Sequence, residues 1–440
     1  MAQLFPIHAI RFAQACNGQD ISSYISPPYD VLDEEPKQAL LRANPCNIVA
    51  VDLPVTPPKT VGPDEAYAQA KMQYQQWLAE GVLVADPGAI LYAYEQRFHI
   101  DNHAHTRRGL FATVATEEYN RPHGVFRHEN TIRGGTDDRL KLMTATNAQL
   151  SPVFAVFDDA DGLVQTELLQ QCEARGSDFW GRTSHDQVEH HCWRINDEEV
   201  LARLRNALLP KDVFVADGHH RYTTAFNYAK QHPNTGEAAR CLSVLVPMQD
   251  PGVVVLPTHR IIVGLKDFSM EALTRALNEE PDLELMGPVD PAQDAHQLAR
   301  DLPRHDHHAI GLVDPSSGRA YILRACSEDP LAKYMPDHPR VWRTLDIAVL
   351  HTLFLERVLK RHFGGESVTY KYHHDIDQGL DLAKSSHNGL LALVQPTSLD
   401  EVCQVAKADA VMPPKSTFFY PKLATGMVIN ALTSRGHNTD

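Results

Sequence analysis

Short apolar runs separated by segments of helical periodicity occupy most of this chain. Runs of the kind that form buried strands lie at 153–157, 188–195, 213–216, 241–246 and 253–262. Apolar residues recur every three or four positions over 64–80, 137–148, 163–169, 198–208 and 222–230, and this spacing predicts helices. Strands that alternate with helices are typical of an α/β fold, here with mixed α+β character.

The same pattern divides the chain into parts. Residues 89–98 and 108–116 predict a hairpin around the polar turn at 101–102. The pattern restarts with an expected helix, two strands and a further helix, at 270–277, 309–313, 320–324 and 346–361. We therefore expect three parts, which are an N-terminal α/β segment, a central core and a C-terminal α/β domain, over 1–88, 89–265 and 266–440.

The segment VFVADGHHRY, at 213–222, contains the residues best suited to chemistry. A strand that ends in a glycine turn and opens a helix presents N–H groups and a positive dipole end, which suit a phosphate. Asp217 suits a metal ion, Gly218 permits close approach of the backbone, and Arg221 suits phosphoryl oxygens. His219 and His220 complete the run. The alternative is a turn whose polar residues only cap the helix.

A second run, FRHENT at 126–131, lies just before another expected helix. Glu129, with His128 beside it, suits a general base or a carboxylate that holds metal-bound water. The alternative is a carboxylate that stabilises the helix dipole. Together with the phosphate turn, this run favours a catalytic interpretation, with Arg127 and Thr131 as substrate contacts.

A third run, VMPPKSTFFYPKLATGM at 411–427, does not fit a regular helix. Lys415, Ser416 and Thr417 in a constrained turn suit phosphate, and Lys422 suits phosphate or a substrate carboxylate. The pattern GxxxxGK is absent, so no P-loop is expected. The alternative is a packed terminal segment with solvated lysines.

Weaker candidates lie elsewhere. His259 and Arg260, at an apolar strand, are expected as substrate contacts. Tyr29 and Asp30 in the sequence PPYD are expected to form a turn rather than to bind a substrate.

Composition narrows the possible functions. A net charge of −15 over 440 residues argues against a broad nucleic-acid surface. Seven cysteines without CxxC spacing indicate neither a zinc site nor a disulfide framework and fit a reduced compartment. No apolar run has the length of a membrane span and no secretion signal is visible, so we expect a cytoplasmic protein.

Four motifs together carry a resemblance to a known family. SPPYD, RHENT, DGHHRY and MPPKSTFFYPKL resemble the bacterial and archaeal family catalogued as domain of unknown function 1015. The central part of that family is similar to the free-serine kinases called SerK, whose fold is shared with ParB and sulfiredoxin. The resemblance implies a ParB/sulfiredoxin-like central nucleotide-binding domain with additional α/β segments at both ends. It assigns the base role to Glu129 and the phosphates to the turn from Asp217 to Arg221.

The expected activity is therefore phosphoryl transfer from ATP or ADP, with Mg²⁺ at Asp217, to the hydroxyl of free L-serine or a similar hydroxylated amino acid. The expected partners are the nucleotide and this small substrate, and a homo-dimer stays open. One alternative is a regulatory switch of the ParB class that binds CTP. A sulfiredoxin-like repair enzyme is disfavoured, because no cysteine lies within or next to DGHHR.

Overall fold

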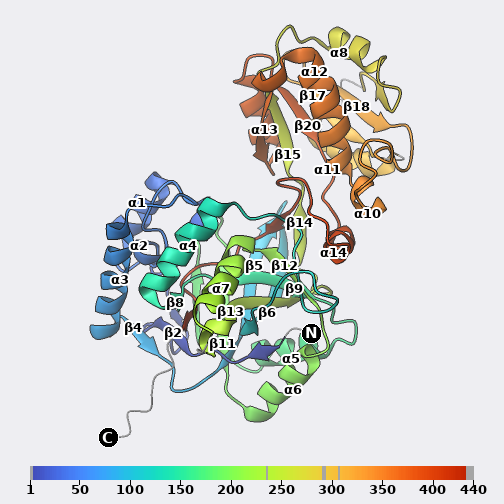
Figure 1. Ribbon diagram of the computed structural model, residues 1–440. Coiled ribbons are helices and arrows are strands. Elements are labelled where there is room, and N and C mark those ends of the chain that lie inside the picture. The colour runs from blue at the N-terminus through green and yellow to red at the C-terminus, as the bar shows by residue number, and fades with distance from the viewer. Residues whose placement is uncertain (1–2, 234–235, 290–293, 306–307, 433–440) are drawn as a thin grey trace, which may run out of the picture. The chain divides into compact units, whose positions relative to one another are not determined.

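The chain forms two compact units, each described here by itself. The structure is a computed structural model that describes residues 3–233, 236–289, 294–305 and 308–432. The first unit comprises Met1–Val254 and Pro421–Asp440, and the second comprises Val255–Tyr420 (Figure 1). Residues 1–88 thus belong to the same compact unit as most of the expected core. The chain also returns to this first unit after completing the second.

A mixed sheet forms the centre of the first unit. Within the described residues it has ten strands, in the order β3-β10-β11-β5-β6-β13-β9-β12-β7, with β1 paired to β6. The pairs β13·β9, β12·β7 and β10·β3 are parallel and the other pairs are antiparallel. The strands are β1 (Leu4–Phe5), β3 (Gln19–Asp20), β5 (Leu91–Ile100), β6 (His103–Ala115), β7 (Val125–Phe126), β9 (Val153–Phe157), β10 (Phe179–Arg182), β11 (Glu189–Ile195), β12 (Val213–Asp217) and β13 (Arg240–Pro247). This architecture confirms the expected α/β class with mixed sheets.

A smaller antiparallel sheet joins the two ends of the chain. Its order is β4-β2-β22-β8. The strands are β2 (Ala9–Phe12), β4 (Leu83–Ala85), β8 (Ala148–Gln149) and β22 (Ile429–Ala431). Because β22 pairs with β2 and β8, the segment after Tyr420 is built into the first unit.

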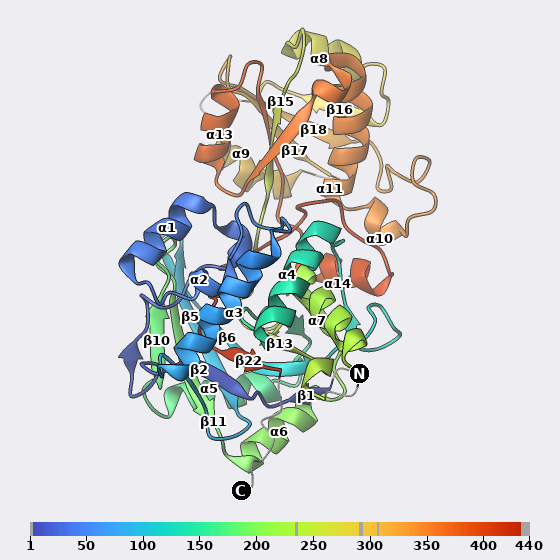
Figure 2. The same cartoon turned by 60° about the vertical axis from the view of Figure 1, so that its left-hand side comes forward.

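Helices pack around these sheets. They are α1 (Glu34–Ala43), α2 (Val49–Asp52), α3 (Asp64–Ala79), α4 (Arg133–Thr146), α5 (Leu163–Glu173), α6 (Glu198–Leu208) and α7 (His219–Gln231), with short 3-10 turns at Tyr29–Val31 and Glu237–Ala239. Helix α4 lies between α3 and α7 (Figures 1 and 2). One buried apolar cluster connects the large sheet with α5, α6 and α7.

The second unit has its own sheet and cores. Within its described residues six strands follow the order β16-β18-β17-β20-β15-β19, all antiparallel. They are β15 (His259–Val263), β16 (Leu283–Met286), β17 (Ile310–Asp314), β18 (Arg319–Ala325), β19 (Thr369–His373) and β20 (Leu390–Leu393). The helices are α8 (Met270–Leu277), α9 (Ala295–Asp301), α10 (Arg340–Arg343), α11 (Asp346–Val349) with its π-helical continuation Leu350–Lys360 and α12 (Arg361–Phe363), α13 (Ile376–Lys384) and α14 (Leu399–Lys407), and 3-10 turns lie at Leu302–Arg304 and Gly365–Ser367. Strands β14 (Val254–Leu256) and β21 (Phe418–Tyr420) pair with each other.

Two expected elements differ from the structure in ways that affect the site. Helix α7 begins at His219 rather than at Tyr222, because the single residue Gly218, with a φ of 93°, makes the turn from strand to helix. The run over 253–262 is not one strand. It breaks into β14 and β15 around Pro257, which has no N–H to donate to a ladder.

The large sheet predicts where truncation of a side chain is costly. Leu245 is 1% exposed on β13, between Leu110 of β6 and Ala155 of β9. We expect Leu245→Ala to lower the free energy of unfolding by about 2–5 kcal/mol, since it leaves a cavity. The matched change Leu163→Ala, at a side chain 58% exposed, should cost no more than about 0.5 kcal/mol. Urea unfolding followed by circular dichroism measures both, and equal losses would contradict this account of the core.

Candidate functional site

The start of α7 places polar groups at the end of a buried strand. Strand β12 ends at Asp217, Gly218 is the N-cap, and His219 opens a helix of 13 residues. The φ of 93° at Gly218 lies in the left-handed region that favours glycine. The first N–H groups of a helix have no partner within it and carry the positive end of its dipole. This end of the strand is therefore suited to an anion.

Asp217 holds two cations beside that helix end. Its Oδ2 accepts from Arg221 Nη2 at 2.6 Å, and its Oδ1 accepts from Lys422 Nζ at 2.6 Å. Burial raises the pKa of the Asp217 carboxyl, but Lys422 and Arg221 lower it by more, so the pKa lies well below its usual range. Arg221 also donates to the carbonyl oxygen of Pro152. Two positive side chains are thus fixed at the start of α7.

Lys422 comes from the returning C-terminal segment, and the large sheet fixes its backbone. Gln96 of β5 donates to the Lys422 carbonyl oxygen at 3.0 Å, and Arg107 of β6 donates to the Pro421 carbonyl oxygen at 2.6 Å. Arg107 is fully buried, and this burial lowers the pKa of its guanidinium to about 10. These two hydrogen bonds therefore hold the backbone of the returning segment against the large sheet, next to the side-chain contact with Asp217.

Glu129 lies beside the first residue of α7. Its Oε2 is 3.8 Å from Nδ1 of His219, and the backbone N–H of His128 donates to Nε2 of His219 at 3.5 Å. Because Nε2 accepts, the proton of neutral His219 resides on Nδ1, which faces the carboxylate. Burial lowers the pKa of His128 to about 4 and that of His219 well below its usual range. Both rings are neutral at pH 7.

His220 joins the start of α4 to that of α7. Its Nε2 accepts from the backbone N–H of Ile132 at 3.0 Å. A Cβ at Gly135 would come within 2.7 Å of the His220 ring, so only glycine allows α4 to approach this closely. Burial, followed by the charge of Lys59, lowers the pKa of His220 to about 4. The FRHENT and DGHHR segments are thus brought together, as the sequence predicts.

Sequence reasoning missed two charged residues at this site. Lys59 Nζ lies 3.2 Å from Asp30 Oδ2. Burial and the charge of Asp217 raise the pKa of Asp30, but Lys59, Arg221 and Lys422 together bring it below its usual value. The sequence PPYD was interpreted as a turn, and Tyr29–Val31 is indeed a 3-10 turn. The turn also places Asp30 where the charges of Asp217, Arg221 and Lys422 act on its carboxylate.

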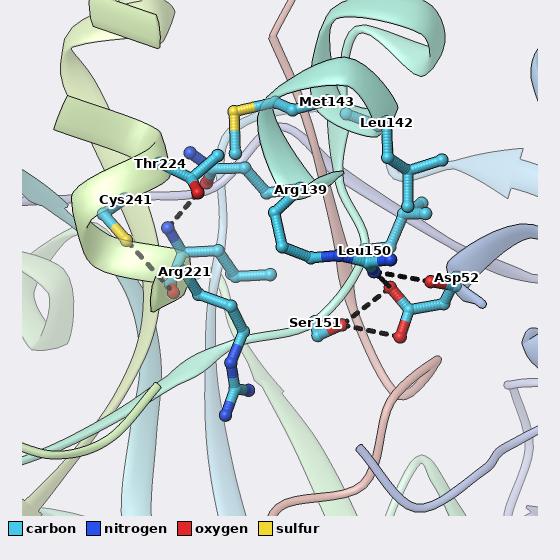
Figure 3. A pocket seen from close by; sticks show the side chains of 12 residues that line it. Asp52, Arg139, Leu142, Met143, Leu150, Ser151, Arg221, Thr224 and Cys241 are labelled. Atoms are coloured by element: carbon cyan, nitrogen blue, oxygen red, sulfur yellow. Dashed lines mark hydrogen bonds and ion pairs between the residues drawn. The ribbon is translucent and has the colours of Figure 1, made fainter. Parts of the chain in front are cut away.

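A polar network beneath the site connects these segments. The Arg139 guanidinium lies 3.9 Å above the Tyr29 ring and donates to the Asp52 carbonyl oxygen at 2.5 Å. Ser151 donates to the Asp52 carboxylate at 2.9 Å (Figure 3). Asp52, Arg139, Ser151 and Arg221 line a cavity of about 40 Å³, room for one or two waters. Burial raises the pKa of Asp52, and Arg139 opposes this shift.

The other predicted contacts from FRHENT border the same region. The Arg127 guanidinium lies 5.3 Å from the Tyr119 ring centre, and its charge helps to lower the pKa of His219. Thr131 is half-buried in the loop between Glu129 and α4. Their assignment as substrate contacts stays a prediction.

Five further predicted residues belong to the second unit, where the structure brings several of them together. Buried Arg260 donates to the carbonyl oxygens of Pro414 and Lys415 at 3.2 and 3.0 Å. Ser416 donates to the Pro413 carbonyl oxygen at 2.6 Å. His259 and Thr417 lie in the same unit. The assignment of Lys415, Ser416 and Thr417 to the nucleotide, and of His259 and Arg260 to the substrate, stays a prediction.

The side chains around Asp217 determine whether this site suits a metal ion. Within the described part of the chain no three His, Cys, Asp or Glu side chains gather as metal ligands. Both oxygens of Asp217 accept from cations, so a metal ion there would have to displace Lys422 or Arg221. This arrangement does not fit a metal held by Asp217 alone.

The described helices include none with the length and apolarity to cross a membrane.

The fold and the site together define a mixed α/β protein in which a helix start, flanked by a carboxylate and two cations, is suited to an anion. Residues 4–348 match the family described as protein of unknown function (DUF1015), and the chain belongs to this family. The matched range includes FRHENT and DGHHR but ends before Lys422. No curated protein matches the chain.

Solved structures show distant similarity. A free serine kinase variant in complex with ADP has 14% identity and a TM-score of 0.34, with 72% of this chain and 92% of that chain covered. A free serine kinase in complex with AMP has 14% identity and a TM-score of 0.32, over 71% and 94%. SbnI with C-terminal truncation, from Staphylococcus aureus, has 10% identity and a TM-score of 0.33, over 72% and 87%.

The backbone at Gly218 predicts a selective loss of anion binding. A Cβ there would come within 2.9 Å of Arg221 Nε and would sit on a residue with positive φ. We expect Gly218→Ala to weaken the binding of a phosphate-bearing anion by about tenfold or more, because Arg221 must leave its position on Asp217 and a charge-assisted hydrogen bond is lost. Calorimetric titration with ADP tests this. Gly176→Ala, where a Cβ meets nothing within 4 Å, is the control, and equal affinities in both variants would contradict it.

The buried neutral histidines predict a loss of stability in acid. The unfolded chain binds a proton on each histidine near pH 6.5, whereas folded His128 does so only near pH 4. Stability is therefore complete above pH 6.5 and falls as the pH is lowered toward 4, by up to about 1.4 kcal/mol per pH unit for each such histidine. We expect His128→Asn to show a shallower fall in urea unfolding. His99→Asn, at an exposed position, should follow the wild type, and an unchanged slope in His128→Asn would refute the assignment.

Proposed function

We propose that this protein is a small-molecule kinase that transfers a phosphoryl group from ATP or ADP to the hydroxyl of free L-serine or a similar hydroxylated amino acid. One observation carries the proposal. The Glu129 carboxylate lies 3.8 Å from His219 in the first turn of α7, the helix whose start is flanked by Arg221 and Lys422. A base and an anion site therefore adjoin each other.

The phosphate side of the proposed reaction uses fixed positive charge. Phosphoryl transfer depends on positioning and charge neutralisation more than on covalent chemistry by the protein. Arg221 has five N–H donors, of which Nη1 and Nη2 bind Pro152 and Asp217. Its remaining donors, together with the N–H groups at the start of α7, suit phosphate oxygens. Asp217 acts in this scheme by orienting Arg221 and Lys422.

The acceptor side uses Glu129 as the base. Its side chain is 34% exposed, so a small hydroxylated substrate can reach it. As the acceptor oxygen forms its bond to phosphorus, Glu129 takes the hydroxyl proton, and the bond to the nucleotide's bridging oxygen breaks with its electron pair leaving on the nucleotide. Neutral His219, with its proton on Nδ1, orients the carboxylate. Mg²⁺ bound to the nucleotide phosphates would supply additional charge neutralisation.

The proposal predicts a separation of catalysis from binding. We expect Glu129→Gln to lower the rate of phosphoserine formation by about 10²–10⁴, because the amide cannot accept the proton, while the dissociation constant for the nucleotide changes little. Product formation with labelled ATP or ADP, Mg²⁺ and L-serine gives the rate, and calorimetry gives the affinity. Glu199→Gln, at an exposed position on α6, is the matched control.

A second pair of variants tests the phosphate side. Arg221→Ala should weaken nucleotide binding by about 10–100-fold, the effect of a lost charge-assisted hydrogen bond, whereas the exposed Arg205→Ala should not.

Full activity in Glu129→Gln would refute the base assignment. If ATP, ADP or CTP binds and Arg221→Ala abolishes that binding, yet no hydroxylated amino acid is phosphorylated, the kinase proposal fails and a nucleotide-dependent switch takes its place.

A further inference from the structure

The ion pair between Asp30 and Lys59 takes no part in the proposed transfer of the phosphoryl group. Nζ of Lys59 lies 3.2 Å from Oδ2 of Asp30, and the two side chains are 25% and 23% exposed. Both are thus partly sheltered and still open to a small ligand. A sheltered pair of opposite charges is costly to break unless each charge finds a new partner.

The pair adjoins the anion site. The start of α4 connects them, because the Ile132 N–H at its N-cap donates to His220 Nε2 at 3.0 Å, and the charge of Lys59 helps to lower the pKa of His220. The backbone also brings Lys59 close to α4, because a Cβ at Gly134 would lie 3.0 Å from the Lys59 carbonyl oxygen.

The structure holds each member of the pair in place. Tyr29, next to Asp30, is buried beneath the Arg139 guanidinium at 3.9 Å. Lys59 has a φ of 65°, in the left-handed region that costs an ordinary residue about 1–2 kcal/mol. Its loop is held near its end, where the Gly62 N–H donates to the Tyr67 hydroxyl at 3.1 Å. The fold thus places a lysine at a position where glycine or asparagine would adopt the backbone conformation with less strain.

We propose that Asp30 and Lys59 recognise the two charged groups of a zwitterionic acceptor. The ammonium of the acceptor binds Asp30 and its carboxylate binds Lys59, so the internal ion pair is exchanged for two pairs with the ligand. The proposal rests on the proposed function and extends it by assigning the residues that select an amino acid over other small alcohols.

Charge balance explains the selectivity. A zwitterion replaces both partners, and no charge is left alone at the site. A hydroxylated monoanion satisfies only Lys59 and leaves Asp30 unpaired, whereas a hydroxylated cation does the reverse. A neutral alcohol offers a partner to neither side chain. Nucleotide phosphates fit this pair poorly, because Asp30 repels them.

The test removes one charge at a time from protein and ligand. The ligands are L-serine, serinamide without the carboxylate, and 3-hydroxypropionate without the ammonium, measured with ADP-loaded protein by calorimetry and with ATP or ADP by initial rates. We expect Lys59→Met to weaken L-serine binding by about 10–100-fold but not to weaken serinamide binding, since serinamide leaves Lys59 unpaired in the wild type. Asp30→Asn should weaken L-serine similarly but should not weaken 3-hydroxypropionate, which leaves Asp30 unpaired. Lys71→Met and Asp64→Asn, at exposed positions of neighbouring α3, are the controls.

The outcomes separate this inference from the kinase proposal. If the wild type prefers L-serine to the singly charged analogues and the variants lose that preference, Asp30 and Lys59 are established as the residues that bind the zwitterion, even where no phosphoryl transfer follows. In that case only the kinase proposal fails. The inference is overturned if the wild type shows no preference for a zwitterion. It is equally overturned if Lys59→Met weakens ADP instead of the amino acid, which would make Lys59 a phosphate ligand.

Discussion

The site depends on one carboxylate that satisfies two cations from distant parts of the sequence. Asp217 ends a buried strand, Arg221 follows one helical turn later, and Lys422 arrives from the C-terminal segment. Loss of one partner from such a sheltered group typically costs several kcal/mol, because the remaining charge is left uncompensated. The triad therefore fixes the end of β12, the first turn of α7 and the returning segment in one arrangement. The basic character of the helix start follows from it.

Much of the fold follows from local pattern. The periodicity over 198–208 and 270–277 gives α6 and α8 with the expected bounds, and the hairpin of β5 and β6 turns where its polar residues predict. DGHHR and FRHENT each adjoin an expected helix, and the family resemblance assigns both to one site. The hydrogen bond from the His128 N–H to Nε2 of His219 joins the two runs.

The parts that sequence reasoning missed depend on contacts over long separations. Nothing local to PPYD says that Asp30 faces Lys59 or lies close to Asp217. That placement comes from the Tyr29 ring beneath Arg139, more than a hundred residues away. The start of α7 was placed three residues late, because a helix opened by a lone left-handed glycine has no periodicity to reveal it. The break between β14 and β15 at Pro257 was likewise not predicted, because it lies within an apolar run.

The return of the chain to its first unit has a consequence for biosynthesis. Strand β22 and Lys422 are made only after the whole of the second unit, although they belong with residues made much earlier. While the ribosome is still translating the second unit, the smaller sheet lacks β22, one of its two inner strands, and Asp217 lacks one of its two cations. A prematurely terminated chain contains FRHENT and DGHHR and yet lacks the lysine that completes the cluster around Asp217. The order of synthesis thereby keeps unfinished molecules from acquiring the full site.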